Sequence, residues 1–139
     1  MKKIKVETIV KNDIGKVWKF WNDPAHITQW AFASDDWECP HASNDLREGG
    51  KFLTRMRAKD GSASFDFTGT YTHVIPNKKI EYQTDDGRAV SVTFEQAGGD
   101  GVKIIEEFEM ENINSEEMQR GGWQAILNNF KKYVEASQN

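Results

Sequence analysis

A carboxylate interrupts the apolar face of one predicted β-strand. Residues 102–110 alternate between apolar and polar side chains, and the apolar set includes Ile104 and Phe108. Glu106 falls on that same face by the period of two. A buried carboxylate without a partner is costly, so it either raises its pKa or finds hydrogen-bond donors or a cation. The pattern predicts a polar anchor inside an apolar pocket, and the alternative is a bulge that turns Glu106 outward and Ile105 inward.

Three further polar side chains come from neighbouring candidate strands. His73 shares a face with Tyr71, but it lies close to a proline turn, so a half-exposed histidine is favoured over a role in a site. The alternation of residues 51–57 places Arg55 and Arg57 on a solvated outer face. A register slip of one residue would instead bring both arginines into the cavity, where they would pair with a carboxylate.

The sequence lacks the spacing of a metal site and the motifs of a nucleophile. Its histidines are at positions 26, 41 and 73, and Cys39 is the one cysteine. No Gly-rich phosphate loop or nucleophile elbow is present. We therefore expect no metal and no cofactor. Catalysis stays open, because no catalytic motif is evident.

Aromatic residues are abundant, with eight Phe, five Trp and three Tyr. Most of them should pack in the core, while any that face a void would suit a flat or apolar ligand. Gly121 and Gly122 lie inside a predicted helix, where each costs about 1 kcal/mol relative to Ala. Either the regular helix begins only at Trp123, or the absent side chains leave room for a ligand. The predicted cavity residues are Trp18, Trp30, Trp37, Phe67, Tyr71, His73, Phe94, Glu106, Gly122 and Trp123.

A long amphipathic helix is predicted at residues 114–137. Apolar side chains recur there at the spacing of one helical face, from Trp123 to Val134. Asn114 followed three residues later by Glu117 has the form of a capping box. This helix is the only predicted element long enough to cover a whole sheet.

The rest of the chain predicts two short helices and a series of strands. The helices carry residues 17–21 and 24–32, and they follow the first strand directly. Gly- or Pro-bearing turns separate the later strands, which indicates consecutive hairpins and an antiparallel meander. The expected fold is α+β, with about six to seven strands around the last helix. The predicted strands are residues 3–10, 51–57, 65–73, 80–84, 89–95 and 102–110, with less regular ones near 37–41 and 45–48.

The length, charge and hydropathy of the chain indicate a single domain that neither binds nucleic acid nor spans a membrane. The 139 residues suit one domain, 1–139, and the net charge of −4 without a basic run argues against nucleic acid as a partner. No apolar run approaches the roughly 18 residues that span a bilayer. A single cysteine fits a reducing compartment, so we expect a soluble cytoplasmic protein.

Five short motifs, in order along nearly the whole chain, carry a family resemblance. The chain resembles the START-like, polyketide-cyclase (SRPBCC) superfamily of helix-grip domains, and within it the bacterial homologues of the activator of heat-shock protein 90 ATPase. The resemblance implies a ligand cavity enclosed by the sheet and the long helix. The motifs are residues 14–18, 24–30, 49–52, 69–76 and 122–123.

The leading functional hypothesis is a binding module that holds a small apolar, aromatic or lipid-like ligand between the sheet and the last helix. One alternative is a cyclase- or hydrolase-like enzyme that uses Glu106 as acid or base, with His73 or Tyr71 as its partner. A second alternative is a co-chaperone with a protein partner, which rests on the family resemblance alone.

Overall fold

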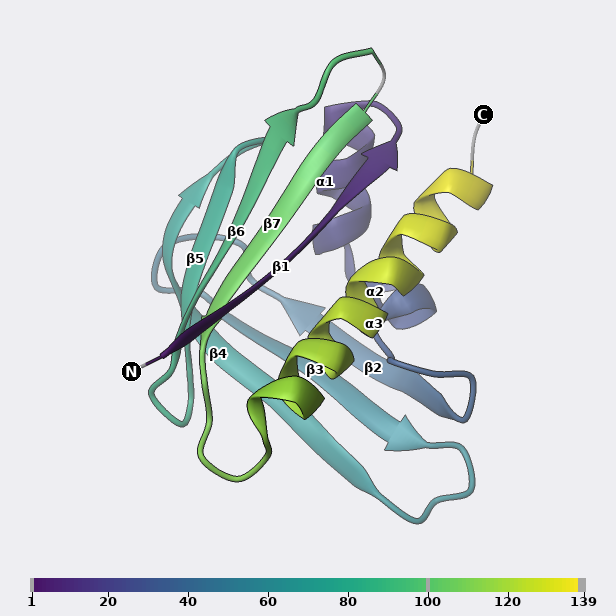
Figure 1. The fold of residues 1–139 in the computed structure, drawn as a ribbon, viewed down its shortest axis with the longest axis vertical. Helices are drawn as coiled ribbons and strands as arrows, with labels where there is room; N and C mark the ends of the chain where they lie inside the picture. Colours follow the sequence, from purple (N-terminus) through teal and green to yellow (C-terminus); the bar gives the residue numbers. More distant parts are fainter. Residues whose placement is uncertain (1, 100, 138–139) are drawn as a thin grey trace.

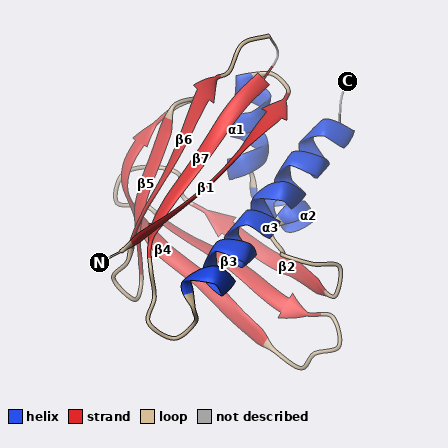
Figure 2. Ribbon diagram, in the orientation of Figure 1, coloured by secondary structure: helices blue, strands red, loops and turns tan. Residues whose placement is uncertain are grey.

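A computed structural model describes residues 2–99 and 101–137, and Figure 1 shows its course. One antiparallel sheet curls around a long C-terminal helix, with two short helices after the first strand (Figures 1 and 2). The expected α+β helix-grip fold is therefore confirmed. The elements are β1 (Lys3–Lys11), α1 (Ile14–Asn22), α2 (Pro24–Trp30), β2 (Trp37–Asn44), β3 (Lys51–Ala58), β4 (Ser64–Ile75), β5 (Lys79–Thr84), β6 (Ala89–Gln96), β7 (Gly101–Glu109) and α3 (Glu116–Ala136).

The sheet has seven strands in the order β1-β7-β6-β5-β4-β3-β2. The strands from β2 to β7 form the predicted meander, and β1 joins its far edge by pairing with β7. Tight turns connect the hairpins, and Gly61 and Gly87 adopt φ of 79° and 89°, which L side chains rarely reach. Turn chemistry thus agrees with the hairpin order that the sequence predicts.

The pairing of β4 with its neighbour β5 is irregular. The register shifts between Tyr71 and His73, which is a β-bulge that bends the strand. Next to this bulge, a Cβ added at Gly69 would lie 2.7 Å from the ring of Phe52 and 2.8 Å from the carbonyl oxygen of Gln83. Glycine is needed there because the Phe52 ring crosses the backbone. The bend makes the inner face concave.

The second half of α3 closes the core. Leu127, Phe130 and Val134 are fully buried, and both α1 and α2 contact this helix. Burying each of these side chains contributes roughly 1.5–3 kcal/mol. The indole nitrogen of Trp30 donates to the carbonyl oxygen of Phe20 at 3.0 Å, which ties α2 to α1.

Three local expectations need correction. Ser115, not Asn114, is the N-cap of α3, because its hydroxyl accepts from the amide of Met118. The helix runs without interruption through Gly121 and Gly122, so it does not begin at Trp123. The strand expected near residues 45–48 is a turn, since the chain folds back there between β2 and β3.

The cap assignment predicts a stability difference. Ser115→Ala removes the acceptor for the Met118 amide and should lower the free energy of unfolding by about 1 kcal/mol. Ser115→Asp keeps an acceptor and should retain most of the stability. Urea unfolding followed by circular dichroism measures both variants, and equal stability of the two would contradict the assignment.

Candidate functional site

A hollow lies under the first half of α3, between that helix and the concave face of the sheet. Its volume is about 630 Å³, and small-molecule sites usually measure roughly 300 to 1,000 Å³. The helices α1 and α2 bound it at one end, and the loop between β7 and α3 bounds it at the other. The space is thus large enough for a small organic molecule.

Aromatic rings form much of its wall. Phe52 lies at the centre of one group, with ring centroids 5.3 Å from Tyr71 and 4.8 Å from Tyr82. From the helix side, Trp123 stacks on Phe108 at 3.9 Å with an angle of 12° between the ring planes. Edge-to-face and offset contacts of this kind hold rings in fixed orientations. The wall is therefore apolar and well ordered.

Most of the predicted cavity residues reach this hollow, and three do not. Trp18 and Phe94 pack against each other in the core with centroids 5.3 Å apart, outside the lining. The His73 ring also lies outside it, 3.3 Å from the carboxylate of Glu48. The β-bulge after Tyr71 breaks the period of two, which explains why counting placed His73 on the inner face. The candidates on the lining are Trp30, Trp37, Phe67, Tyr71, Glu106, Gly122 and Trp123.

Glu106 points inward from β7. The strand pairs regularly with both neighbours, so that Glu106 lies opposite Val6 on β1 and Val92 on β6. The outward alternative fails because β7 has no bulge that could rotate the side chain. Glu106 is 6% exposed, and its carboxyl group has no hydrogen-bond partner within the described part of the chain. Burial raises its pKa from 4.5 to about 8.

Asn44 and Tyr82 are polar residues of the lining that were not singled out from the sequence. The Tyr71 hydroxyl donates to the Asn44 side chain at 2.5 Å, and Asn44 in turn donates to the carbonyl oxygen of Asn22 at 2.8 Å. Tyr82 follows Ile80 by two residues on β5, so the same alternation count would have placed it inside. Asn44 gave no such signal because the pairing of β2 is irregular.

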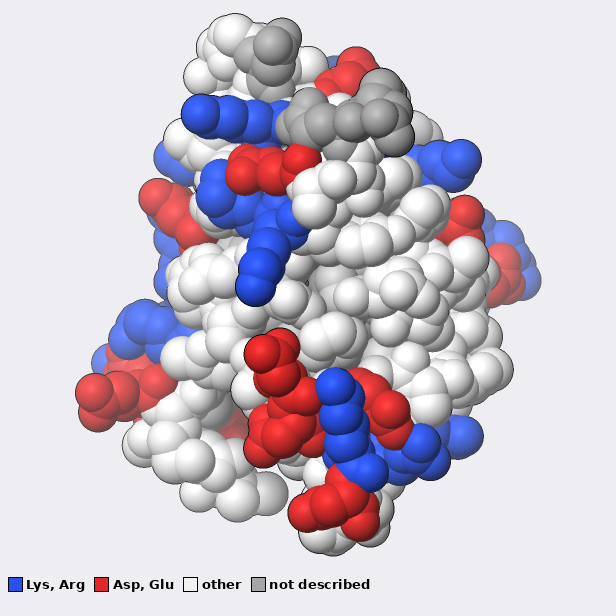
Figure 3. All heavy atoms as spheres, turned by 90° about the vertical axis from the view of Figure 1, so that its right-hand side faces the viewer, with Lys and Arg blue, Asp and Glu red and all other residues white. Residues whose placement is uncertain are grey.

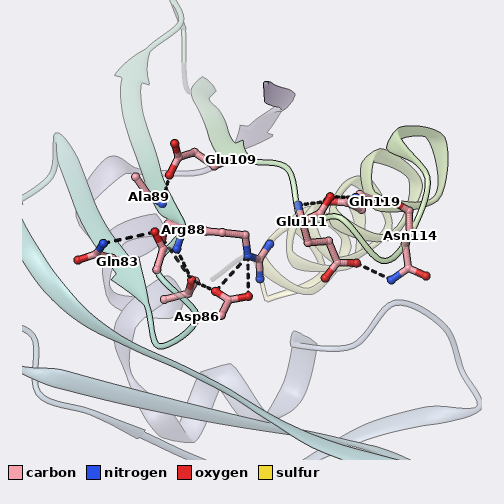
Figure 4. Close-up of polar contacts among 10 residues, drawn as sticks. Gln83, Asp86, Arg88, Ala89, Glu109, Glu111, Asn114 and Gln119 are labelled. Atoms are coloured by element: carbon pink, nitrogen blue, oxygen red, sulfur yellow. Dashed lines mark hydrogen bonds and ion pairs between the residues drawn. The ribbon is translucent and has the colours of Figure 1, made fainter. Parts of the chain in front are cut away.

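Arg88 reaches the hollow from the turn between β5 and β6. Its side chain is only 12% exposed, and its Nε donates to both carboxylate oxygens of Asp86, at 3.1 and 2.9 Å (Figure 4). The Thr84 hydroxyl also donates to Asp86, and these contacts hold the pKa of Asp86 below its usual value. A charged residue in a turn is ordinarily expected to be exposed to solvent, so the sequence did not indicate that Arg88 lines the hollow.

The two helical glycines differ in what lies beside them. Gly122 borders the hollow, whereas Gly121 faces solvent. A Cβ added at either position would meet nothing within 4 Å. The absence of a side chain at Gly122 therefore leaves open space in the hollow.

The remaining arginine candidates lie on the outer face of the sheet, as expected. Arg55 pairs with Asp66 at 2.8 Å, and Arg57 pairs with Glu38. Both arginines are well exposed, so neither pair makes a large contribution to stability. No register slip has brought them into the hollow.

Within the described ranges 2–99 and 101–137, we find no metal site, no exposed thiol and no membrane-spanning helix. No group of three or more His, Cys, Asp or Glu side chains there could hold a metal ion. Cys39 is buried, and burial raises the pKa of its thiol. None of the helices described is long and apolar enough to cross a membrane.

On the face that Figure 3 shows, acidic and basic side chains lie close together around an uncharged middle.

Glu106 should make stability depend on pH. Its pKa is about 8 in the folded protein and 4.5 ordinarily, so folding carries no penalty below pH 4.5 and the full penalty above pH 8. Glu106→Gln should therefore gain stability over the natural protein as pH rises through this window, by on the order of 5 kcal/mol. Urea unfolding at several pH values measures the difference.

The matched control is Glu107→Gln, because Glu107 is the next residue of β7 and points to the opposite face. We expect the pH dependence of the natural protein to persist in this control. A stability difference between Glu106→Gln and the natural protein that stays constant from pH 4.5 to 9 would contradict the burial of a neutral carboxyl group.

Solved structures with the same fold include close relatives. An AHSA1-like protein from Aeromonas hydrophila is 44% identical, with a TM-score of 0.91 over 98% of this chain and 94% of that one. A protein from Cytophaga hutchinsonii is 52% identical, with a TM-score of 0.82 over 97% of this chain and 93% of that one. A protein from Nitrosomonas europaea, 14% identical over 97% of this chain and 95% of that one, has a TM-score of 0.81 and shows the fold alone.

A comparison with curated proteins finds no match. The sequence model of one family, described as "Activator of Hsp90 ATPase homolog 1-like protein", matches residues 12–135. This match takes in every element from α1 to the last turn of α3. Together with the two close structural relatives, it shows that the chain belongs to the family of activator of Hsp90 ATPase homologue 1-like proteins.

Proposed function

We propose that the protein binds a small apolar or aromatic molecule in the hollow under α3. The observation that carries this proposal is the hollow itself, about 630 Å³ in volume and walled by aromatic rings. Apolar, concave spaces with a few polar groups are typical of small-molecule sites. The open space beside Gly122 supports the proposal, because an ordinary helical residue there would narrow the hollow.

The polar groups of the lining support binding more than catalysis. An acid–base pair would need a second titratable group within hydrogen-bond reach of Glu106. His73 contacts Glu48 instead, at 3.3 Å, and the Tyr71 hydroxyl is engaged with Asn44. The expected partners of an enzymatic Glu106 are therefore not assembled around it.

The setting we infer for this binding is one domain in the cytoplasm. All seven strands belong to one sheet around one helix, which supports a single folding unit. The single cysteine of the chain, Cys39, excludes an intrachain disulfide and suits a reducing compartment.

Filling the hollow should abolish binding. Gly122→Leu places an apolar side chain in the open space, while Gly121→Leu makes the same chemical change on the solvent side of α3. Both variants gain helix propensity, so both should fold at least as stably as the natural protein. With a panel of small aromatic and aliphatic compounds followed by protein NMR, we expect Gly122→Leu to weaken binding more than tenfold and Gly121→Leu to leave it unchanged.

Circular dichroism serves as the check that both leucine variants are folded. Two results would contradict the proposal. One is that no compound shifts the resonances of residues that line the hollow. The other is that compounds bind equally well to both variants, which would place binding elsewhere on the protein.

A further inference from the structure

We infer that the ligand carries a carboxylate head group, which Arg88, Tyr82 and Glu106 bind together while its apolar body lies among the aromatic rings. The inference rests on the proposed function and names the class of ligand. It follows from where these three side chains lie, from which of their atoms lack partners, and from whether those atoms donate or accept hydrogen bonds.

Strand register places the three side chains on one stretch of the inner face. Tyr82 on β5 lies opposite Val90 on β6, and Glu106 on β7 lies opposite Val92, two residues further along. Arg88 lies in the turn just before β6, and its side chain lines the same hollow. Tyr82 therefore lies between Arg88 at one end and Glu106 at the other, and both side chains are near enough to influence its pKa.

These side chains have hydrogen-bonding groups that the protein leaves unused. Elsewhere in the lining, Gln119 is fully engaged: its side chain donates to the carbonyl oxygens of Glu111 and Asn114 and accepts from the Glu111 amide. Within the described residues, by contrast, neither the carboxyl group of Glu106 nor the hydroxyl of Tyr82 makes a hydrogen bond. Both side chains line the hollow, where a ligand or water can pair with their oxygens.

Arg88 contributes a free edge of its guanidinium group. Only its Nε is engaged, by Asp86, and within the described residues its two terminal nitrogens have no partner. Figure 4 shows the side chain held by Asp86 and extended toward the loop that carries Glu111. Asp86 thus fixes the direction of the fork and leaves its terminal donors for a ligand. A planar fork of this kind matches a carboxylate.

All three free groups are donors near neutral pH. Burial raises the pKa of Glu106 to about 8, so its carboxyl group is protonated and offers an O–H. Burial also raises the pKa of Tyr82, whose hydroxyl stays protonated, and the guanidinium group of Arg88 has only donors. Three donors on the lining of one hollow suit a head group that only accepts hydrogen bonds, and a carboxylate is such a group. An ammonium group would leave every donor unpaired.

The groups that face Glu106 are few. Tyr71 on β4, Tyr82 on β5 and Arg88 in the β5–β6 turn line the hollow from the sheet, and Glu111 lines it from the loop before α3. Its strand neighbours Val6 and Val92 are apolar. The α3 residues of the lining carry no charge; they are Met118, Gln119, Gly122, Trp123 and Ile126.

Three ten-carbon compounds test the head group. Decanoate, 1-decanol and decylamine share one apolar body, and calorimetric titration at pH 7 compares their affinities. We expect decanoate to bind about tenfold more tightly than either of the others, because only it pairs with the Arg88 fork. In Arg88→Met this preference should disappear. Arg55→Met, on the outer face, is the matched control and should keep it.

A pH series gives a second readout that does not depend on Arg88 variants folding. When Glu106 loses its proton it loses its donor and gains a like charge. Decanoate affinity should therefore fall as pH rises through about 8, by at most about tenfold per pH unit. Glu106→Gln keeps a donor without a titrating group, so its decanoate affinity should stay level over the same range.

The possible results separate the two proposals. Equal binding of decanoate and decanol, a preference for decylamine, or decanoate affinity that is level or rises through pH 8 in the natural protein would overturn the carboxylate inference. In each of these cases the proposed function would stand, provided that Gly122→Leu still blocks binding. Binding of none of the three compounds, together with an unresponsive panel, would overturn both proposals.

Discussion

A curled sheet with one apolar face must be covered, and in this protein a helix of 21 residues supplies most of the cover. The helix does this unevenly. Its second half carries Leu127, Phe130 and Val134, which are fully buried against the sheet and the two short helices. Its first half carries Gly121, Gly122 and an exposed Met118. The same helix thus closes the core at one end and leaves a hollow at the other, and every other feature of the site follows from this imbalance.

The hollow changes the chemistry of the side chains around it. A carboxyl group on an apolar strand of a solid core would lack any contact with water or ligand, whereas Glu106 borders open space while remaining 6% exposed. Its neutral form is favoured there, which lowers stability at high pH but supplies a hydrogen-bond donor at neutral pH. The protein tolerates an unpartnered polar group where a ligand would satisfy it, a common pattern at functional sites.

Period and turn chemistry made most of the fold predictable from sequence. The alternation of apolar and polar residues predicted the strands and the inward position of Glu106, and the 3.6-residue period predicted α3. Counting failed where the backbone departs from regularity. The bulge after Tyr71 moves His73 out of the inner face. The N-cap of α3 is Ser115 and not Asn114, the residue before it. Arg88 was missed for another reason: a charged residue in a turn is ordinarily solvated, and its local contact with Asp86 gives no sign in the sequence that the Arg88 side chain is only 12% exposed.

The most direct test of this account is the titration of Glu106 itself. Carbon-13 NMR of the side-chain carboxyl groups follows each glutamate as pH is raised, and Glu106→Gln identifies the resonance that belongs to Glu106. We expect this resonance to titrate near pH 8, far above the ordinary value of 4.5. A midpoint close to 4.5 would show a charged, solvated carboxylate at neutral pH and would contradict both the neutral donor in the hollow and the ligand class inferred from it.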